Sequence, residues 1–430
     1  MSNSEISGVH GRRVWDSRGR PTIEVEVTLA SGVRGRAIAP AGASTGSGEA
    51  VDLRDGGKRF GGADVLQAIG HVNGEIARAL KGQDASRQGD IDQLLIKLDG
   101  TANKSRLGGN ALVATSMAVL HAAAASSGQP LYAYLLGGRA PIMPLPEVQI
   151  FGGGAHAGRR VDIQDFMVVA PKAASFAEAL EWTAEIYRAA GELMSEAGLR
   201  QGVADEGGFW PAFSSNEAAL DTLMRAIERA GFTPGDEVAI SLDIAASEFY
   251  RDGVYRLALE NCVLDSDGLS EMLIHWLDRY PIVSIEDPLA EHDVEGLTRF
   301  TQAVGRRMQI VGDDFLVTNA DRVRRAAALP ACNAVLIKPN QAGTVSEALA
   351  AIEAARVAQW GSIVSARSGE TEDVTIVHLA VGWNVQQLKV GSFSRSERMA
   401  KWNEALRIEE AFAGRARFAG FEPYRKKPKA

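Results

Sequence analysis

Six short apolar runs in the second half of the chain each end in a charged residue or a charged cluster. The runs are AISLDI, IVSIED, QIVGDD, AVLIKPN, SIVSARSG and VQQLKVGS, and their charged residues are Asp243, Glu286, Asp313, Lys338, Arg367 and Lys389. Successive charged residues are 43, 27, 25, 29 and 22 positions apart, and most of these intervals suit one buried strand, one helix and their loops. Continuous Val/Ile/Leu runs are typical of parallel strands covered on both faces. The pattern therefore predicts an α/β fold with a (β/α)8 barrel.

In such a barrel the carboxyl ends of all strands open onto one face, where the chemistry takes place. Three carboxylates followed by three cations around that face therefore predict a binding site. Carboxylate oxygens suit a hard cation such as Mg²⁺, and the cationic side chains suit a phosphate and a carboxylate. The alternative, solvated charges at the starts of loops, requires six coincidences at strand ends.

The composition narrows the classes of partner. The 430 residues exceed one ordinary domain, and a net charge of −8 gives no field that favours nucleic acid. The basic run at 425–429 is interpreted as a frayed terminus. With no signal-peptide pattern and no apolar stretch of membrane length, we expect a soluble cytoplasmic protein without a membrane partner. Cys262 and Cys332 form no CxxC pair, which predicts buried thiols in a reducing compartment.

The first 135 or so residues show a different pattern. Residues 22–29 alternate strictly between apolar and polar, and a Ser-Gly turn leads into 34–38, which predicts a β-hairpin on an antiparallel sheet. Apolar residues with a 3.6 period predict a helix near 64–81. An alanine-rich stretch predicts a second, closely packed helix over about 110–125. These elements predict an α+β domain.

The domain boundaries follow from this change of pattern. We assign 1–135 to the α+β N-terminal domain, 136–146 to a linker with three prolines and two glycines, and 147–430 to the barrel.

Two further strands and two helices are expected at the start of the barrel. The strand candidates are Gln164–Ala170 and Arg200–Ala204, and the helices are Phe176–Ala197 and Asn216–Ala230. Asn216 is well placed to cap the second helix.

Nine segments resemble one family. They are DSRGRPTIEVEV (16–27), PAGASTGSGEAVDLRDG (40–56), DEGG (205–208), SLDIAASEFY (241–250), SIEDP (284–288), VGDD (311–314), KPNQAGT (338–344), RSGETED (367–373) and RSERMAKWNEALRIEE (395–410). In this order they closely resemble enolase, the glycolytic phosphopyruvate hydratase, from about residue 5 to 415. The resemblance implies an α+β domain before a modified (β/α)8 barrel. It also implies Mg²⁺-dependent dehydration of 2-phosphoglycerate to phosphoenolpyruvate, and a homodimer or a ring of dimers.

The resemblance assigns roles to twelve residues. Asp243, Glu286 and Asp313 correspond to ligands of one Mg²⁺, and Ser44, in the 42–46 loop, to a group that helps bind a second. Lys338 corresponds to the base and Glu206 to the acid that helps the hydroxyl leave. Arg367, Ser368 and Lys389 correspond to groups that bind the substrate's phosphate and carboxylate, and His156, Gln164 and Asp165 to further substrate contacts. For His156 a satisfied buried histidine is the alternative, although the preceding GGG favours a loop of close approach.

These roles suit the chemistry. A proton α to a carboxylate is very weakly acidic, because its removal adds a second negative charge to the group. Two Mg²⁺ ions can stabilise that charge. A lysine acts as the base near neutral pH only if burial and neighbouring cations depress its pKa, which is what we expect for Lys338.

Four positions depart from the family pattern. The motif NGGSH is here Gly152-Gly153-Gly154-Ala155-His156, so its Asn and Ser are missing. The Gln-Glu pair is here Gln164-Asp165, one methylene shorter, and SHRSG is here Ser365-Ala366-Arg367, which lacks a histidine. The metal ligands and both lysines are intact, whereas Asp165 and Ala366 belong to the side where the hydroxyl leaves.

Three hypotheses follow. The protein is an enolase whose departures are neutral, with water filling the gaps. Alternatively, it is a diverged paralogue that uses the same enolate chemistry on a related phospho- or phosphono-carboxylate, as in the formation of carboxyphosphonoenolpyruvate. Thirdly, it is a non-catalytic scaffold that binds phosphoenolpyruvate or a protein. The intact metal and lysine set argues against the scaffold.

Overall fold

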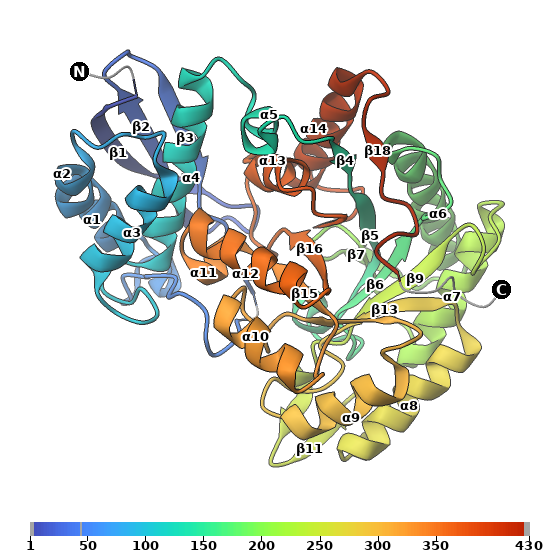
Figure 1. Cartoon of the computed structure of the whole chain (residues 1–430). Coiled ribbons are helices and arrows are strands. Elements are labelled where there is room, and N and C mark those ends of the chain that lie inside the picture. The colour runs from blue at the N-terminus through green and yellow to red at the C-terminus, as the bar shows by residue number, and fades with distance from the viewer. Residues whose placement is uncertain (1–3, 44, 425–430) are drawn as a thin grey trace.

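The computed structural model describes residues 4–43 and 45–424 and shows a small sheet domain beside a closed barrel (Figure 1). Eight strands form the barrel: β5 (Leu145–Gly152), β6 (Asp165–Val169), β9 (Ala239–Asp243), β13 (Ile282–Glu286), β14 (Gln309–Gly312), β15 (Ala334–Ile337), β16 (Gly361–Ser365) and β17 (Gln387–Gly391). The pairing of β17 with β5 closes the ring. The predicted barrel is confirmed, and the six apolar runs form β9 and β13 to β17.

The strand predicted at Arg200–Ala204 is present, but it is not part of the barrel. Residues 200–203 form β7 (Arg200–Val203), which is exposed and pairs only with β8 (Phe209–Pro211), outside the ring. The eighth barrel strand is β5, whose first two residues lie in the stretch assigned to the linker, where β4 (Ile142–Met143) also lies. The prolines of that stretch indicated a linker, but Pro146 is the second residue of β5, a position near the start of a strand where proline is tolerated.

The direction of β6 matters for the site. This strand runs antiparallel to both of its neighbours, β5 and β9, whereas the other barrel pairs are parallel. Its first residue, Asp165, therefore lies at the carboxyl end of the barrel, opposite Asp243 of β9, and Asp243 in turn pairs with Glu286 of β13. Three carboxylates from three adjacent strands thus lie in one row.

The N-terminal domain contains the predicted hairpin, β2 (Pro21–Leu29) and β3 (Arg34–Ile38), with β1 (Ile6–Trp15) as a third strand. The predicted alanine-rich helix is α4 (Gly109–Ser126), which packs on this sheet. The two approach so closely at Gly35 that a Cβ there would lie 2.2 Å from the backbone nitrogen of Ala122.

The remaining helices of this domain are short. The predicted 64–81 helix consists of α1 (Leu66–His71), a π-helical turn (Val72–Ile76) and α2 (Ala77–Leu80). Two others, α3 (Gln88–Asp99) and α5 (Leu131–Leu136), were not predicted.

Helices alternate with the barrel strands and cover the outside of the ring (Figure 1). They are α6 (Phe176–Glu196), α7 (Asn216–Arg229), α8 (Ser266–Arg279), α9 (Val294–Val304), α10 (Ala320–Ala328), α11 (Pro339–Ala342), α12 (Val345–Val357), α13 (Thr375–Gly382) and α14 (Ser396–Phe412). The predicted cap of α7 is wrong by one residue. Ser215 caps the helix by accepting from the Ala218 amide at 3.0 Å, while the Asn216 side chain accepts from the backbone amide of Asp162 at 2.9 Å.

Two small sheets complete the fold. One contains β10 (Tyr250–Arg251), β11 (Val254–Leu257) and β12 (Cys262–Leu264), and in the other β18 (Arg417–Phe418) pairs with β4. Cys332 is buried as predicted, but Cys262, on β12, is only partly buried. The basic run at 425–429 lies outside the described residues. Within 4–43 and 45–424, no helix combines the length and the apolar character that crossing a membrane requires.

Candidate active site

The six charged residues named from the sequence lie at one mouth of the barrel. Asp243 and Glu286 are the last residues of β9 and β13, and Asp313 and Lys338 directly follow β14 and β15. Arg367 lies two residues beyond β16, and Lys389 lies within β17. Five of these side chains are buried, and that of Lys338 is 12% exposed, so this mouth carries opposed charges with little access to water.

Lys389 binds the row of carboxylates. Its Nζ lies 3.0 Å from Asp243 Oδ2, 2.8 Å from Glu286 Oε2 and 3.3 Å from Asp165 Oδ2. Burial lowers the pKa of Lys389, but the carboxylates outweigh burial and raise it well above its usual value. Burial, and then the charge of Asp243, raise the pKa of Glu286 well above its usual range.

Lys338 forms an ion pair with Asp313, and Gln341 Nε2 donates to the same carboxylate at 2.9 Å. Burial and the cations Arg367 and Lys389 lower the pKa of Lys338, but the carboxylates of Asp313 and Glu286 raise it, and the net shift is upward. The depressed pKa predicted for Lys338 relied also on the charge of Mg²⁺, and with the protein's own groups alone the shift has the opposite sign. Lys338 can lose its proton near neutral pH only if another cation neutralises the charge of Asp313.

The carboxylates fit a hard divalent cation. Asp243, Glu286 and Asp313 come from three neighbouring strand ends, and their oxygens are the donors that Mg²⁺ prefers. Glu286 Oε1 is buried and has no hydrogen-bond partner among the described residues. Ser44, expected near a second ion, lies outside those residues.

The structure does not gather these three carboxylates as tightly as two other groups. In the described part of the chain, His156, Asp165 and Glu206 form one group with ligand atoms within 4.8 Å of one another, and Asp287, Asp313 and Asp314 form another. Asp287 accepts from the backbone amides of Asp313 and Asp314, both at 2.9 Å, so it fixes the loop that carries Asp313.

Arg367 has a carboxylate partner that the sequence analysis missed. Both oxygens of Glu49 accept from its guanidinium, at 2.9 and 3.2 Å, and Asn340 Oδ1 accepts at 3.1 Å. Glu49 raises the pKa of Arg367 against the effect of burial. Glu49 Oε1 also accepts from Gln341 Nε2 at 3.3 Å. The loop around Glu49 is therefore joined both to Arg367 and, through Gln341, to Asp313.

The backbone around Arg367 is held by a second buried arginine. Arg398, on α14, donates to the carbonyl oxygens of Arg367 and Ser368 at 2.7 Å and to that of Val390 at 2.9 Å. Its side chain is completely buried. Arg398 therefore joins the loop after β16 to strand β17.

We expect Arg398→Met to lower the free energy of unfolding by about 3–5 kcal/mol, because it leaves three buried carbonyl oxygens without their charged donor. Urea unfolding followed by circular dichroism measures this. Arg407→Met on the same helix is the matched control; Arg407 is 66% exposed and pairs with Glu404, so its loss should cost less than about 1 kcal/mol. Equal destabilisation by the two variants would contradict this account.

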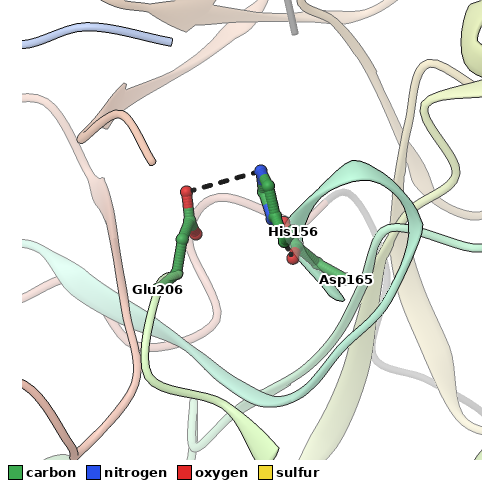
Figure 2. A group of neighbouring side chains, drawn as sticks. All are labelled: His156, Asp165 and Glu206. Atoms are coloured by element: carbon green, nitrogen blue, oxygen red, sulfur yellow. Dashed lines mark hydrogen bonds and ion pairs between the residues drawn. The ribbon is translucent and has the colours of Figure 1, made fainter. Parts of the chain in front are cut away.

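On the other side of the mouth lies a group of three residues, His156, Asp165 and Glu206, which we call the His156 cluster (Figure 2). His156 Nδ1 lies 3.3 Å from Asp165 Oδ1 and its Nε2 lies 3.9 Å from Glu206 Oε1. Burial lowers the pKa of His156, but Glu206 and Asp165 raise it to about 9. His156 is therefore a buried histidine with satisfied partners, which was the alternative to a substrate contact, and it also lines the cavity at the barrel mouth.

The other residues predicted for the site lie around the same small cavity. It is lined by Gly42, Ala43, His156, Gln164, Asp165, Glu206, Asp243, Lys338, Ser365, Ala366, Arg367, Ser368 and Lys389. Gln164 Nε2 donates to Asp243 Oδ2 at 3.0 Å, and Ser368 Oγ accepts from Arg18 Nη1 at 3.4 Å. The cavity has a volume of about 20 Å³, so these side chains leave little free space between them.

Sequence reasoning missed several residues of the site: Glu49, Gln149, Asp287, Gln341 and Arg398. All except Gln149 lie inside segments that carry the family resemblance, and attention to every polar residue there would have found them. Gln149 lies on β5, which was partly assigned to a linker.

The fold and the site define a class: two-domain (β/α)8-barrel proteins with a carboxylate- and lysine-rich site at the carboxyl mouth. Residues 6–135 match the N-terminal domain of enolase, and residues 140–427 match its C-terminal TIM barrel domain. The chain is 50% identical over 421 residues to Enolase 1 of Desulfitobacterium hafniense (strain Y51), which covers 97% of this chain and 96% of that protein. The chain belongs to the enolase family. Membership supports a lyase-type enzyme with enolase-like activity on a small phosphorylated substrate.

Proposed function

We propose that the protein catalyses the dehydration of 2-phosphoglycerate to phosphoenolpyruvate through an enolate. The observation that carries this proposal is the arrangement of Lys338 and Lys389 with Asp243, Glu286 and Asp313 at one mouth of the barrel, where Lys338, Lys389 and Asp243 line a small cavity. These are the groups that removal of a proton beside a carboxylate requires.

Lys338 is proposed to take the α-proton, and Lys389 to bind the substrate carboxylate. Arg367 and Ser368 would bind the phosphate, since a guanidinium matches phosphate oxygens in geometry and charge. Glu206 would donate a proton to the departing hydroxyl, with His156, Gln164 and Asp165 as further contacts on that side.

Asp243, Glu286 and Asp313 would hold Mg²⁺, and Ser44 is proposed to help bind a second ion. When bound, Mg²⁺ would stabilise the second negative charge that deprotonation places on the substrate. In the described structure Lys389 supplies positive charge to Asp243 and Glu286, and Lys338 supplies it to Asp313.

A second candidate is favoured by the His156 cluster and its surroundings. Ala366 stands where the family motif has a histidine, and Asp165 is shorter than the family's glutamate. Both line the cavity beside Glu206. These changes support a related phospho- or phosphono-carboxylate substrate with a different leaving group or electrophile, and carboxyphosphonoenolpyruvate formation is one such reaction.

The deciding experiment mixes purified protein with Mg²⁺ and 2-phosphoglycerate and follows the ultraviolet absorbance of the enol product. Turnover would support the first candidate. Exchange of the α-proton in deuterated water without dehydration would support the second. Binding of phosphoenolpyruvate with no reaction on 2-phosphoglycerate or on related phospho- and phosphono-carboxylates would support a non-catalytic scaffold.

The missing histidine gives a direct prediction. If the protein dehydrates 2-phosphoglycerate, Ala366→His should raise turnover by up to ~10²-fold, because an imidazole there could assist proton transfer to the leaving hydroxyl. Steady-state rates with 2-phosphoglycerate measure this, and Ala366→Asn controls for added volume. Unchanged turnover in both variants would show that position 366 does not govern the leaving group.

We further propose a cytoplasmic location and a homodimer or ring of dimers, without nucleic acid or membrane partners. The free thiols Cys262 and Cys332 suit a reducing compartment. Sedimentation velocity of the purified protein tests the oligomeric state.

A further inference from the structure

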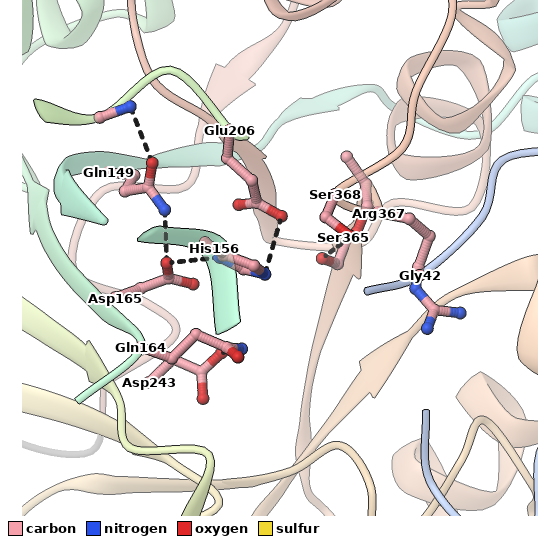
Figure 3. A network of polar contacts seen from close by, with 12 residues as sticks. Gly42, Gln149, His156, Gln164, Asp165, Glu206, Asp243, Ser365, Arg367 and Ser368 are labelled. Carbon is pink, nitrogen blue, oxygen red and sulfur yellow. Dashed lines mark hydrogen bonds and ion pairs between the residues drawn. The ribbon is translucent and has the colours of Figure 1, made fainter. Parts of the chain in front are cut away.

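Beside Glu206 lies a ring of polar contacts that contains one glutamine without an assigned role (Figure 3). Gln149 Nε2 donates to Asp165 Oδ1, and Gln149 Oε1 accepts from the Gly208 amide at 2.8 Å. The same Asp165 oxygen lies 3.3 Å from His156 Nδ1, and His156 Nε2 lies 3.9 Å from Glu206. Because Glu206 and Gly208 belong to one turn, the ring closes through the backbone.

The space for Gln149 is made by two glycines. A Cβ on Gly208 would lie 2.5 Å from Gln149 Oε1. A Cβ on Gly152 would lie 2.6 Å from Ala204 Cβ and 3.3 Å from Gln149 Cδ and Nε2. Gly152 replaces the asparagine of the family motif, so a larger side chain there would meet both Ala204 and the Gln149 amide.

Two departures from the family pattern therefore adjoin one residue. Gly152 leaves room for the Gln149 amide, and the NH₂ group of that amide donates a hydrogen bond to the short Asp165 side chain. The Gln149 side chain is buried, so its donor and acceptor must both be satisfied by the protein. An amide bound to a carboxylate at one end and to an N–H at the other has only one acceptable orientation.

We propose that Gln149 is a positioning residue that fixes Asp165 and His156 relative to Glu206 for departure of the leaving group. This inference rests on the role of Glu206 in the proposed function. Gln149 does not line the cavity and acts only through its neighbours. Misplacing a reacting group by about 1 Å can cost ~10²-fold in rate.

Gln149→Asn keeps the amide but withdraws it from Asp165 by one methylene. We expect dehydration to fall ~10²-fold, while α-proton exchange in deuterated water, which depends on Lys338, changes less than about threefold. Asp165→Glu alone should also lower dehydration, because the longer side chain meets Gln149 in a packed site. The double variant Gln149→Asn/Asp165→Glu restores the combined length and should recover at least about tenfold over either single variant.

The matched control is Gln309→Asn. Gln309 is a buried glutamine at the first residue of β14, four positions before Asp313, and it binds Gln387 and Ser284. The same chemical change there should leave the ratio of exchange to dehydration unaltered. Gln149→Glu, which has nearly the same size but places an oxygen against Asp165, is the second variant should Gln149→Asn fold poorly. It should lose dehydration at least as strongly, and Asp165→Glu should not rescue it.

A spectroscopic readout is independent of turnover. The ¹⁵N signals of His156, assigned with a His156→Asn variant, should shift in Gln149→Asn and return in the double variant. An unshifted spectrum, an equal loss of exchange and dehydration, or absence of rescue would each overturn the inference. If the wild type neither exchanges nor dehydrates 2-phosphoglycerate, the proposed function fails, while the shift and its reversal still test the positioning.

Discussion

Lys338→Ala should abolish both exchange of the substrate's α-proton in deuterated water and dehydration. In the structure Lys338 lines the small cavity, and the other lysine there, Lys389, is held by Asp243, Glu286 and Asp165. Removal of the Lys338 amine therefore leaves the α-proton without a base. Loss of general base catalysis is typically worth ~10²–10⁴-fold, and the effect should lie at the upper end of that range.

Glu206→Gln should separate the two steps. Glutamine keeps the size of the side chain but cannot give a proton to a leaving hydroxyl, so exchange should survive while dehydration falls by ~10²–10⁴-fold. Proton nuclear magnetic resonance follows exchange, and absorbance follows the product, in the same sample. If Lys338→Ala still exchanges the proton, the base is another group; if Glu206→Gln dehydrates at the wild-type rate, the acid lies elsewhere.

The second large effect concerns the carboxylates. Asp243→Ala, Glu286→Ala and Asp313→Ala should each abolish activity, because each removes a charged oxygen ligand. Chelation with EDTA should do the same, and added Mg²⁺ should restore only the wild type. Full turnover by a metal-stripped sample would contradict the assignment of these residues to a metal site.

A control for these variants lies next to one of them. Asp314 adjoins Asp313 but lies against Asp287, and burial followed by the charge of Asp313 raises its pKa to about 8. Asp314→Asn should therefore keep a substantial part of the activity. A loss as complete as that of Asp313→Ala would place Asp314 among the ligands.

The barrel could be predicted from the sequence because its strands are buried on both faces and end in charges, two signals that coincide at six positions. β5 escaped prediction because Pro144 and Pro146 indicate a linker, and only the closed ring shows that a strand is needed there. Conversely, 200–203 does form a strand, but Val203 is its one strongly apolar residue and is exposed, and the strand lies outside the ring.

The site was predictable where single residues carry charge at strand ends, and unpredictable where contacts join distant segments. The pKa of Lys338 depends on the contact with Asp313, 25 residues away in the chain. The role proposed for Gln149 depends on the antiparallel direction of β6, which brings Asp165 beside it. A local sequence pattern predicts neither the direction of a pKa shift, which depends on distant charges, nor the direction in which a strand runs in the sheet.

The contact between Glu49 and Arg367 has a consequence for protein engineering. Glu49 precedes the barrel by almost a hundred residues, yet it provides a carboxylate to a deeply buried arginine of the barrel. An excised barrel would lose this charge and expose the cavity, so it is a poor starting point for a minimal catalyst. Chimaeras between relatives should exchange the segment containing Glu49 together with the loop after β16, because the two form one electrostatic unit built from separate domains.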